Sequence, residues 1–148
     1  MKSIKFRACD RKERRMERVI SLAWDDNRDY PTFVETESCS YSLVGLQDII
    51  LMRYIGRKDK NNKEIYEEDI VKGYLKNGDE IIGIVRYNPK EATYYIEVIK
   101  IKFFGEDEYS IFCIPVYLYH IYNIEVIGNI YENPELLEEG KHESNNRI

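Results

Sequence analysis

The chain has 148 residues, 43% of them hydrophobic and 33% charged, and a formal net charge of −5. A chain of this size can bury enough surface for one domain, or for two small lobes with a shared core, without a metal or a disulfide. No apolar run is long enough to predict a membrane span, and no secretory signal is recognisable. The cysteines are odd in number and widely spaced, which argues against a disulfide framework or a zinc site and predicts a reducing cytoplasm: Cys9, Cys39 and Cys113.

The first predicted element is a strand at residues 3–8, because apolar and basic residues alternate there. One face of this strand would carry Ile4, Phe6 and Ala8. A polar turn follows, and residues 19–24 are predicted to be the antiparallel partner strand. Residues 12–20 also have good helix propensity, so a short helix there stays open as the alternative.

Two weaker elements precede the centre of the chain. Residues 32–36 are predicted to be a strand, and the apolar residues of 43–51 are spaced as in a helical turn. An apolar run at residues 51–55 then predicts a strand that ends at Gly56. The polar cluster at residues 58–63 predicts a tight turn, because Asn tolerates the left-handed conformation that such turns require.

A β-hairpin is predicted immediately after this central stretch. Its two strands are expected at residues 69–74 and 80–87, on either side of Asn77 and Gly78. The Asn-Gly dipeptide between two apolar runs is the strongest short-range signal of a hairpin, because both residues accept the positive φ angles of its turn.

The next predicted strand, residues 94–104, contains an irregularity. Up to Val98 its apolar residues share one parity, and from Ile99 onward they share the other. This change predicts a β-bulge, of the kind that curved sheets and small barrels use. Lys100 and Lys102 are expected to point outward.

The last long apolar segment is less regular. Residues 109–122 are apolar on both parities, which predicts a strand that is buried on both faces or that lies at an interface. Pro115 lacks the backbone N–H that a central strand needs, so it favours an edge or a break. Residues 124–131 are predicted to be the final strand.

The predicted fold class is mainly β. We expect a small, partly open SH3-like barrel within residues 51–139, with a β-rich N-terminal segment, residues 1–50, packed on it. An Asn-Pro-Glu sequence predicts the start of a short C-terminal helix at residues 136–139. Residues 140–148 are expected to be a disordered tail.

Three blocks of the sequence resemble the YopX family of phage and prophage proteins. They are residues 4–8 (IKFRA), residues 51–71 (LMRYIGRKDKNNKEIYEEDIV) and residues 124–137 (IEVIGNIYENPELL). Together they include both ends and the centre of the chain. The resemblance implies a β-rich, phage-encoded protein, and it implies no enzymatic activity.

The chain departs from the pattern of that family at three positions. Cys9 stands where the family usually has Trp, and Asn62 and Glu68 stand where it has Gly. Asn62 is able to hold a turn with positive φ at modest cost. Glu68 is poorly suited to that conformation, so the corner at this position is expected to be built differently here.

The tyrosines suggest a function. Thirteen are present, and tyrosine is enriched at protein interfaces because its ring packs while its hydroxyl stays in water. We therefore predict a non-enzymatic interaction module that acts in the host cytoplasm and binds a protein partner or a second copy of itself. The partner-binding residues are predicted to be Tyr54, Tyr66, Tyr109, Tyr117, Tyr119 and Tyr122.

A basic N-terminal arm suggests the alternative function. Residues 1–20 carry a net charge of +5, whereas the rest of the chain carries −10. An acidic body disfavours general DNA binding, but the arm could follow a nucleic-acid backbone. We favour the simpler interpretation, that the arm neutralises the acidic body within one subunit or between two. The candidate nucleic-acid residues are Lys5, Arg7, Arg11, Arg14, Arg15 and Arg18.

A calcium loop is only half present. Asp25, Asn27 and Asp29 have the spacing of its first ligands, but Tyr30 and Thr36 occupy the positions that require Gly and Glu. We therefore expect no calcium site at this loop.

An acidic cluster suggests a third, more distant function. Its carboxylates could hold Mg²⁺ for phosphodiester cleavage, but no general base with a partner accompanies them. We expect solvated acids, no catalytic or metal-binding residue and no cofactor. His120 and Cys113 have no triad pattern around them, and no phosphate-binding loop is present. The cluster consists of Glu64, Glu67, Glu68 and Asp69.

Overall fold

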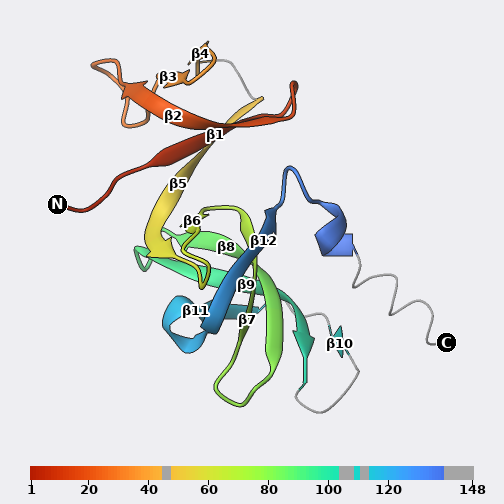
Figure 1. Ribbon diagram of the computed structural model, residues 1–148. Coiled ribbons are helices and arrows are strands. Elements are labelled where there is room, and N and C mark those ends of the chain that lie inside the picture. The colour runs from red at the N-terminus through yellow and green to blue at the C-terminus, as the bar shows by residue number, and fades with distance from the viewer. Residues whose placement is uncertain (45–47, 104–108, 111–113, 139–148) are drawn as a thin grey trace. The chain divides into compact units, whose positions relative to one another are not determined.

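The computed structural model describes residues 1–44, 48–103, 109–110 and 114–138. The chain divides into two compact units, Met1–Tyr54 and Ile55–Ile148. Both consist of antiparallel strands, and residues 135–138 are helical (Figure 1). The prediction of a mainly β fold with a short C-terminal helix is confirmed. The predicted end of that helix and the predicted tail, residues 140–148, lie outside the described residues.

The first unit contains β1 to β4 and the beginning of β5, in the spatial order β4-β3-β2-β1-β5. Its core includes Ala8, Cys9, Val34 and Met52, each at most 3% exposed. Ile4 precedes the first strand and is exposed, so the prediction that it shares a strand face with Phe6 and Ala8 is wrong. The strands are β1 (Phe6–Asp10), β2 (Arg15–Ala23), β3 (Phe33–Thr36), β4 (Ser40–Ser42) and β5 (Ile49–Lys58).

Two helical alternatives in the first unit are wrong. Residues 12–20 form a turn and the first part of β2, and Ile49 and Ile50 open β5 instead of ending a helical turn. In both cases β1 supplies the reason, because it pairs with β2 on one side and with β5 on the other. Backbone pairing on two sides outweighs a weak local preference for helix.

Asp10 organises the turn between β1 and β2. Its carboxylate accepts the backbone N–H groups of Lys12 and Glu13, both at 3.0 Å, and the hydroxyl of Tyr41 donates to it at 3.2 Å. The Glu13 N–H is the main cause that lowers the pKa of Asp10, against the opposing effect of burial. Burial is the main cause that raises the pKa of Tyr41 to about 12. The contact joins the β1–β2 turn to β4.

The second unit has the sheet order β10-β9-β8-β7-β12, and β11 also pairs with β9. The sheet is not closed, which agrees with the predicted partly open structure. The description of the fold as SH3-like stays a prediction. The elements are β6 (Glu64–Tyr66), β7 (Asp69–Tyr74), β8 (Glu80–Asn88), β9 (Thr93–Lys102), β10 (Tyr109–Ser110), β11 (Ile114–Tyr117), the 3-10 helix η1 (Leu118–His120) and β12 (Tyr122–Asn129).

The predicted hairpin and bulge are both confirmed. β7 and β8 pair around the Asn77-Gly78 turn, where Gly78 has a φ of 93°. In the β8–β9 ladder Ile82 faces Lys100 whereas Gly83 faces Val98, so Ile99 is the extra residue. Lys100 pairs with Ile82 and therefore lies, after the bulge, on the face opposite to that of Val98, but it is only 6% exposed, so its expected exposure to solvent is wrong.

Asp59 fixes the central turn to β12. Its Oδ1 atom accepts the N–H groups of Asn61 at 2.8 Å and Lys63 at 2.9 Å, and its Oδ2 atom accepts the N–H of Val126 at 2.9 Å. Burial raises the pKa of Asp59, but these backbone hydrogen bonds outweigh it and the pKa is lowered. Asn62 has a φ of 66°, which confirms the predicted left-handed turn.

The corner before β7 is built on Glu68 itself. Glu68 has a φ of 67°, so the expectation that a different geometry would avoid positive φ at this position is wrong. Its N–H donates to the Val85 carbonyl at 3.0 Å, and its carbonyl accepts the Ile130 N–H at 3.1 Å. Its carboxylate also pairs with Arg86. These contacts on three sides hold the residue in a conformation that its side chain disfavours.

This corner leads to a test with two matched variants. Glu68→Ala loses the ion pair and keeps the strained φ, whereas Glu68→Gly loses the same ion pair and relieves the strain. We therefore expect the glycine variant to be more stable than the alanine variant by about 1 kcal/mol. Urea denaturation of the two full-length variants measures the difference. Equal stabilities would show that the left-handed φ at this corner carries no cost.

The end of β12 is capped by asparagine side chains. The Asn129 side-chain oxygen accepts the N–H groups of Tyr131 and Glu132 at 3.1 and 2.8 Å, and Asn133 accepts the Asn129 N–H at 3.2 Å. Gly128 leaves room for this arrangement, because a Cβ there would lie 2.6 Å from the Asn133 side-chain oxygen.

No helix in the described part of the chain is long and apolar enough to cross a membrane.

Candidate partner-binding surface

The predicted strand at residues 109–122 is interrupted. It contains β10, β11, η1 and the first residue of β12, and residues 111–113, with Cys113, lie outside the description. In the described part of the chain β11 pairs with β9 only, so the expectation that Pro115 marks an edge or a break is confirmed. A hydrogen bond of 3.1 Å from the Arg57 side chain to the Leu118 carbonyl fixes η1. The prediction of one continuous strand over residues 109–122 is therefore wrong, because η1 interrupts it.

Three predicted partner-binding tyrosines lie in or beside this interruption. Tyr117, Tyr119 and Tyr122 are 36%, 72% and 53% exposed. The rings of Tyr117 and Tyr119 stack with centroids 5.8 Å apart, and the His120 ring lies 4.2 Å from that of Tyr119. Exposed, mutually stacked rings offer contact area that loses little conformational freedom when a partner covers it.

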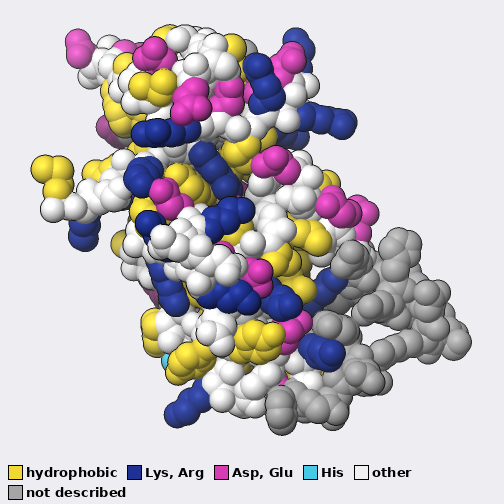
Figure 2. Space-filling model, in the orientation of Figure 1, with side chains coloured by type: hydrophobic (Ala, Val, Ile, Leu, Met, Phe, Trp, Pro, Cys, Tyr) yellow, Lys and Arg dark blue, Asp and Glu magenta, His cyan; other side chains and the backbone are white. Residues whose placement is uncertain are grey.

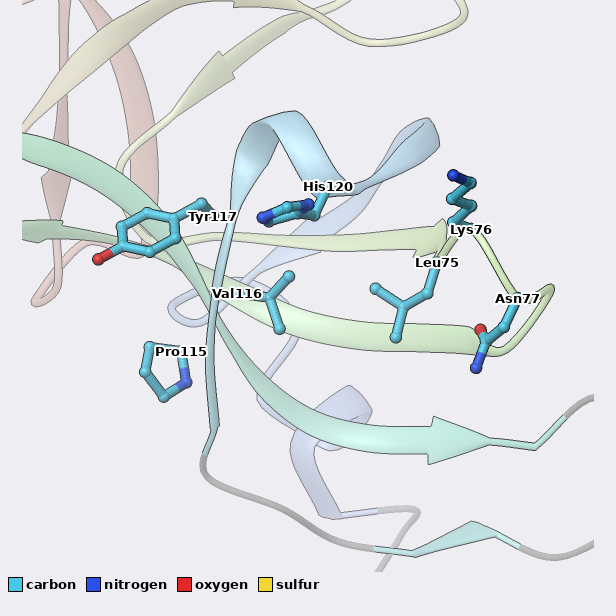
Figure 3. Close-up of a pocket in the computed structure, with 7 residues that line it drawn as sticks. All are labelled: Leu75, Lys76, Asn77, Pro115, Val116, Tyr117 and His120. Carbon is cyan, nitrogen blue, oxygen red and sulfur yellow. The ribbon is translucent and has the colours of Figure 1, made fainter.

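An apolar hollow lies beside these rings. It has a volume of about 440 Å³. The side chains of Leu75 and Val116 point toward one another across it, and both pack on the core of the unit (Figure 3). Its size falls within the range of ligand pockets. The hollow is lined by Leu75, Lys76, Asn77, Pro115, Val116, Tyr117 and His120.

An acidic hollow adjoins the apolar one and shares Pro115 and Tyr117 with it. It has a volume of about 290 Å³. The Tyr117 hydroxyl donates to Glu91 at 2.6 Å, and this hydrogen bond is the main cause that raises the pKa of Tyr117. Side chains alternate along a strand, and Figure 3 places Tyr117 away from Leu75, so β11 separates the two hollows. The acidic hollow is lined by Asn88, Glu91, Tyr95, Glu97, Pro115 and Tyr117.

The other predicted tyrosines lie elsewhere. Tyr54 is 8% exposed, and the Lys5 ammonium lies 5.6 Å from the centre of its ring. Tyr66 is half-buried, and its hydroxyl donates to Glu64 at 2.9 Å. Tyr109 belongs to β10, but its side chain lies outside the description. The surface is therefore built around Tyr117, Tyr119 and Tyr122.

The sequence did not indicate the residues opposite β11. Leu75, Lys76 and Asn77 come from the β7–β8 hairpin, and Glu91 comes from the connection between β8 and β9. Glu91 reaches β11 because Tyr117 pairs with Tyr95 at the start of β9, and the hairpin lies beside η1 because Tyr74 pairs with Tyr122. The Asn77-Gly78 turn could have predicted that the hairpin tip is exposed, but not that it lies beside Val116.

The basic arm is a β-hairpin rather than a loose extension. Arg11 and Arg14 lie in the β1–β2 turn, and Arg15 opens β2, where it donates to the Cys39 sulfur at 3.8 Å. Arg7 and Arg18 face each other in the ladder, and Arg7 also donates to the Met52 sulfur. On the face shown in Figure 2, basic side chains are interspersed with acidic and apolar ones.

The acids of the third hypothesis are each engaged within the protein. Asp69 is buried and accepts the Tyr66 N–H at 2.8 Å, and Glu68 pairs with Arg86. Glu67 accepts the Tyr94 hydroxyl at 3.4 Å. Within the described ranges, no group of three or more His, Cys, Asp or Glu residues is placed to hold a metal ion.

Comparison with known proteins places the chain in a family. The model of the family described as YopX protein matches residues 5–138. The chain belongs to the YopX family. No curated protein matches this YopX-family chain in the comparison.

Two solved structures share the fold of this YopX-family chain. Protein EF1440 from Enterococcus faecalis matches with a TM-score of 0.60 and 22% identity, over 93% of this chain and 100% of that chain. Protein yopX from Bacillus subtilis matches with a TM-score of 0.53 and 20% identity, over the same shares of the two chains. At such identities the likeness establishes the fold alone.

Proposed function

We propose that this YopX-family chain is a non-enzymatic protein-interaction module, and that it binds an extended segment of a partner protein at the apolar hollow and Tyr117. The observation that carries the proposal is the junction of two hollows at one exposed, stacked tyrosine. Tyrosines beside a concave apolar surface are the composition of interface anchors. Such an anchor fixes one part of a partner and leaves the rest to weaker contacts.

The edge position of β11 favours binding through side chains. A partner strand could pair with a free edge, but Pro115 has no N–H to donate, and prolines protect edges against such pairing. A segment that inserts side chains into the hollows avoids this difficulty. We therefore expect an extended peptide in which one apolar side chain enters the space between Leu75 and Val116.

The wider setting is also a proposal. The family resemblance implies a phage or prophage origin, and the cysteine usage suits the host cytoplasm. The bound segment belongs to another protein or to a second copy of this chain, and light scattering over a range of concentrations separates these two partners. We assign no cofactor and no catalytic residue.

A selection experiment with a matched control tests the proposal. The full chain is used to select from a displayed library of random dodecapeptides, and synthetic forms of the selected peptides are titrated by fluorescence anisotropy. Tyr117→Ala should weaken binding by about tenfold or more, because truncation of an interface anchor costs about 1.4 kcal/mol or more. Tyr30→Ala, which removes another exposed tyrosine from the first unit, should bind as the unmodified chain does.

The result that overturns the proposal is equally direct. If no peptide is selected, or if the selected peptides bind Tyr117→Ala and the unmodified chain equally, the surface is not a peptide-binding site. Thermal unfolding of both variants controls for loss of fold. Tyr117 is partly exposed and lies on an edge strand, so its removal should leave the unit folded.

A second candidate function is nucleic-acid binding by the basic arm. The observation that favours it is the presence of Arg11, Arg14 and Arg15 at one end of a hairpin, all exposed to solvent. Phosphate contacts made there would weaken steeply as salt is added. A gel-shift series against salt tests this candidate, and the absence of a shift at low salt removes it.

A further inference from the structure

The acidic hollow has a chemistry of its own. Two carboxylates line it, those of Glu91 and Glu97, together with the rings of Tyr95 and Tyr117. The described residues that line it include no Lys or Arg. Carboxylates beside aromatic rings are the surroundings that favour a cation, through charge-assisted hydrogen bonds and through cation–π contact.

Among the paired groups beside the hollow, the acids outnumber their common cation, Arg86. Arg86 lies between two acids, with its Nε atom 2.9 Å from the Glu97 carboxylate and its Nη1 atom paired with Glu68. These three groups together carry one net negative charge, and Glu91 adds a second. Lys76, the cation of the apolar hollow, lies on the opposite side from Pro115 and Tyr117 (Figure 3).

We infer that the acidic hollow receives an arginine side chain of the bound segment, while an apolar side chain nearby in that segment enters the apolar hollow. The inference rests on the proposed function and names the class of partner, an extended peptide that contains arginine close to an apolar residue. The two positions are close in the peptide because the hollows share Pro115 and Tyr117. Arginine is favoured over lysine, because its planar guanidinium stacks on rings and bonds a carboxylate with two N–H groups.

The hydrogen bond from Tyr117 to Glu91 gives this arrangement a fixed geometry. The short contact of 2.6 Å holds the ring and the carboxylate together before a partner arrives. A guanidinium that meets Glu91 therefore lies beside the Tyr117 ring. Groups that are already in position lose less freedom on binding, which raises affinity.

The test uses the peptides that the full chain selects from the random dodecapeptide library. Arginine should be enriched among them near an apolar residue. In a selected peptide, replacement of arginine by citrulline removes the charge and keeps the shape, and it should weaken binding by about fivefold at low salt. Replacement by lysine should weaken binding by a smaller factor, about twofold.

Protein variants locate the effect. Glu91→Gln removes one charge and keeps an oxygen that accepts from Tyr117, so it should weaken the arginine peptide by about threefold and leave the citrulline peptide unchanged. Glu138→Gln removes an exposed carboxylate that lines neither hollow and should change neither peptide. Selected peptides that lack arginine, or that bind equally with citrulline, overturn the inference and leave the proposed function standing. If every selected peptide binds Tyr117→Ala as tightly as the unmodified chain, both the inference and the proposed function are overturned.

Discussion

Replacement of Asp59 by alanine is expected to lower the free energy of unfolding by about 4 kcal/mol. The carboxylate is 8% exposed and accepts three backbone N–H groups, from Asn61, Lys63 and Val126. Alanine would leave these donors without their acceptor, and an unsatisfied buried donor costs about 1–3 kcal/mol. It would also weaken the link between the central turn and β12, which would keep the hydrogen bond from the Lys60 N–H to the Ile124 carbonyl and the ion pair between Lys60 and Glu125.

Urea denaturation of the full chain measures this loss. The matched control is Asp26→Ala, which removes an exposed aspartate from the loop after β2 and should change stability by less than about 0.5 kcal/mol. A loss of less than about 1 kcal/mol for Asp59→Ala would contradict the role that we assign to the carboxylate.

The same residue predicts a dependence on pH. Because the pKa of Asp59 is lowered in the folded chain from its ordinary value of 3.8, the carboxylate contributes its full stabilisation above that value. The contribution is lost as the pH falls through the lower pKa of the folded state. Asp59→Asn does not titrate, so the stability difference between the two proteins should shrink on acidification below about pH 4.

Replacement of Gly83 by alanine is expected to have the second-largest effect, a loss of about 3 kcal/mol. Gly83 lies on β8 at the bulge, where the β9 strand approaches closely. An added Cβ would lie 2.4 Å from the Ile96 side chain and 2.6 Å from the Glu97 carbonyl oxygen. The first contact could relax, but the second is with backbone inside the β8–β9 ladder.

Gly56→Ala is the control for this variant. A Cβ at Gly56 would meet nothing within 4 Å, but the φ of 86° is strained for alanine. It should therefore cost only about 1 kcal/mol. Urea denaturation should place Gly83→Ala well below Gly56→Ala. If the two variants were equally stable, the close approach of β9 to Gly83 would not govern the packing of this sheet.

The features that were predictable from the sequence are local ones. The Asn77-Gly78 hairpin, the left-handed Asn62 and the bulge at Ile99 each follow from a few neighbouring residues, because turn chemistry and side-chain parity act over that range. The sequence blocks that resemble the YopX family also contain residues that hold turns in place. Asp59 and Asn129 are both buried acceptors of backbone N–H groups.

The features that could not be predicted depend on long-range contacts. Glu68 holds a positive φ because of Val85, Arg86 and Ile130, which surround it only in the folded chain. The link between Asp59 and Val126 spans 67 residues of sequence. Local propensity contains no information about such partners.

The candidate site could be predicted only in part, because it also combines local sequence features with long-range contacts. The stretch around Tyr117 and Tyr119 was visible as an aromatic segment with few charges, whereas the burial of Tyr54 depends on tertiary packing. The acidic side of the site was not visible at all. Glu91 follows β8 by three residues, and only the pairing of β9 with β11 brings it to the Tyr117 hydroxyl.

One measurement tests the central claim most directly, that Tyr117 marks a peptide-binding surface. The isotopically labelled full chain is titrated with a selected arginine peptide, and the backbone amide signals are followed by nuclear magnetic resonance. The account predicts that the shifts concentrate at Lys76, Asn77, Glu91, Val116 and Tyr117. Shifts confined to the basic hairpin around Arg14, or no shifts at saturating peptide, would contradict it.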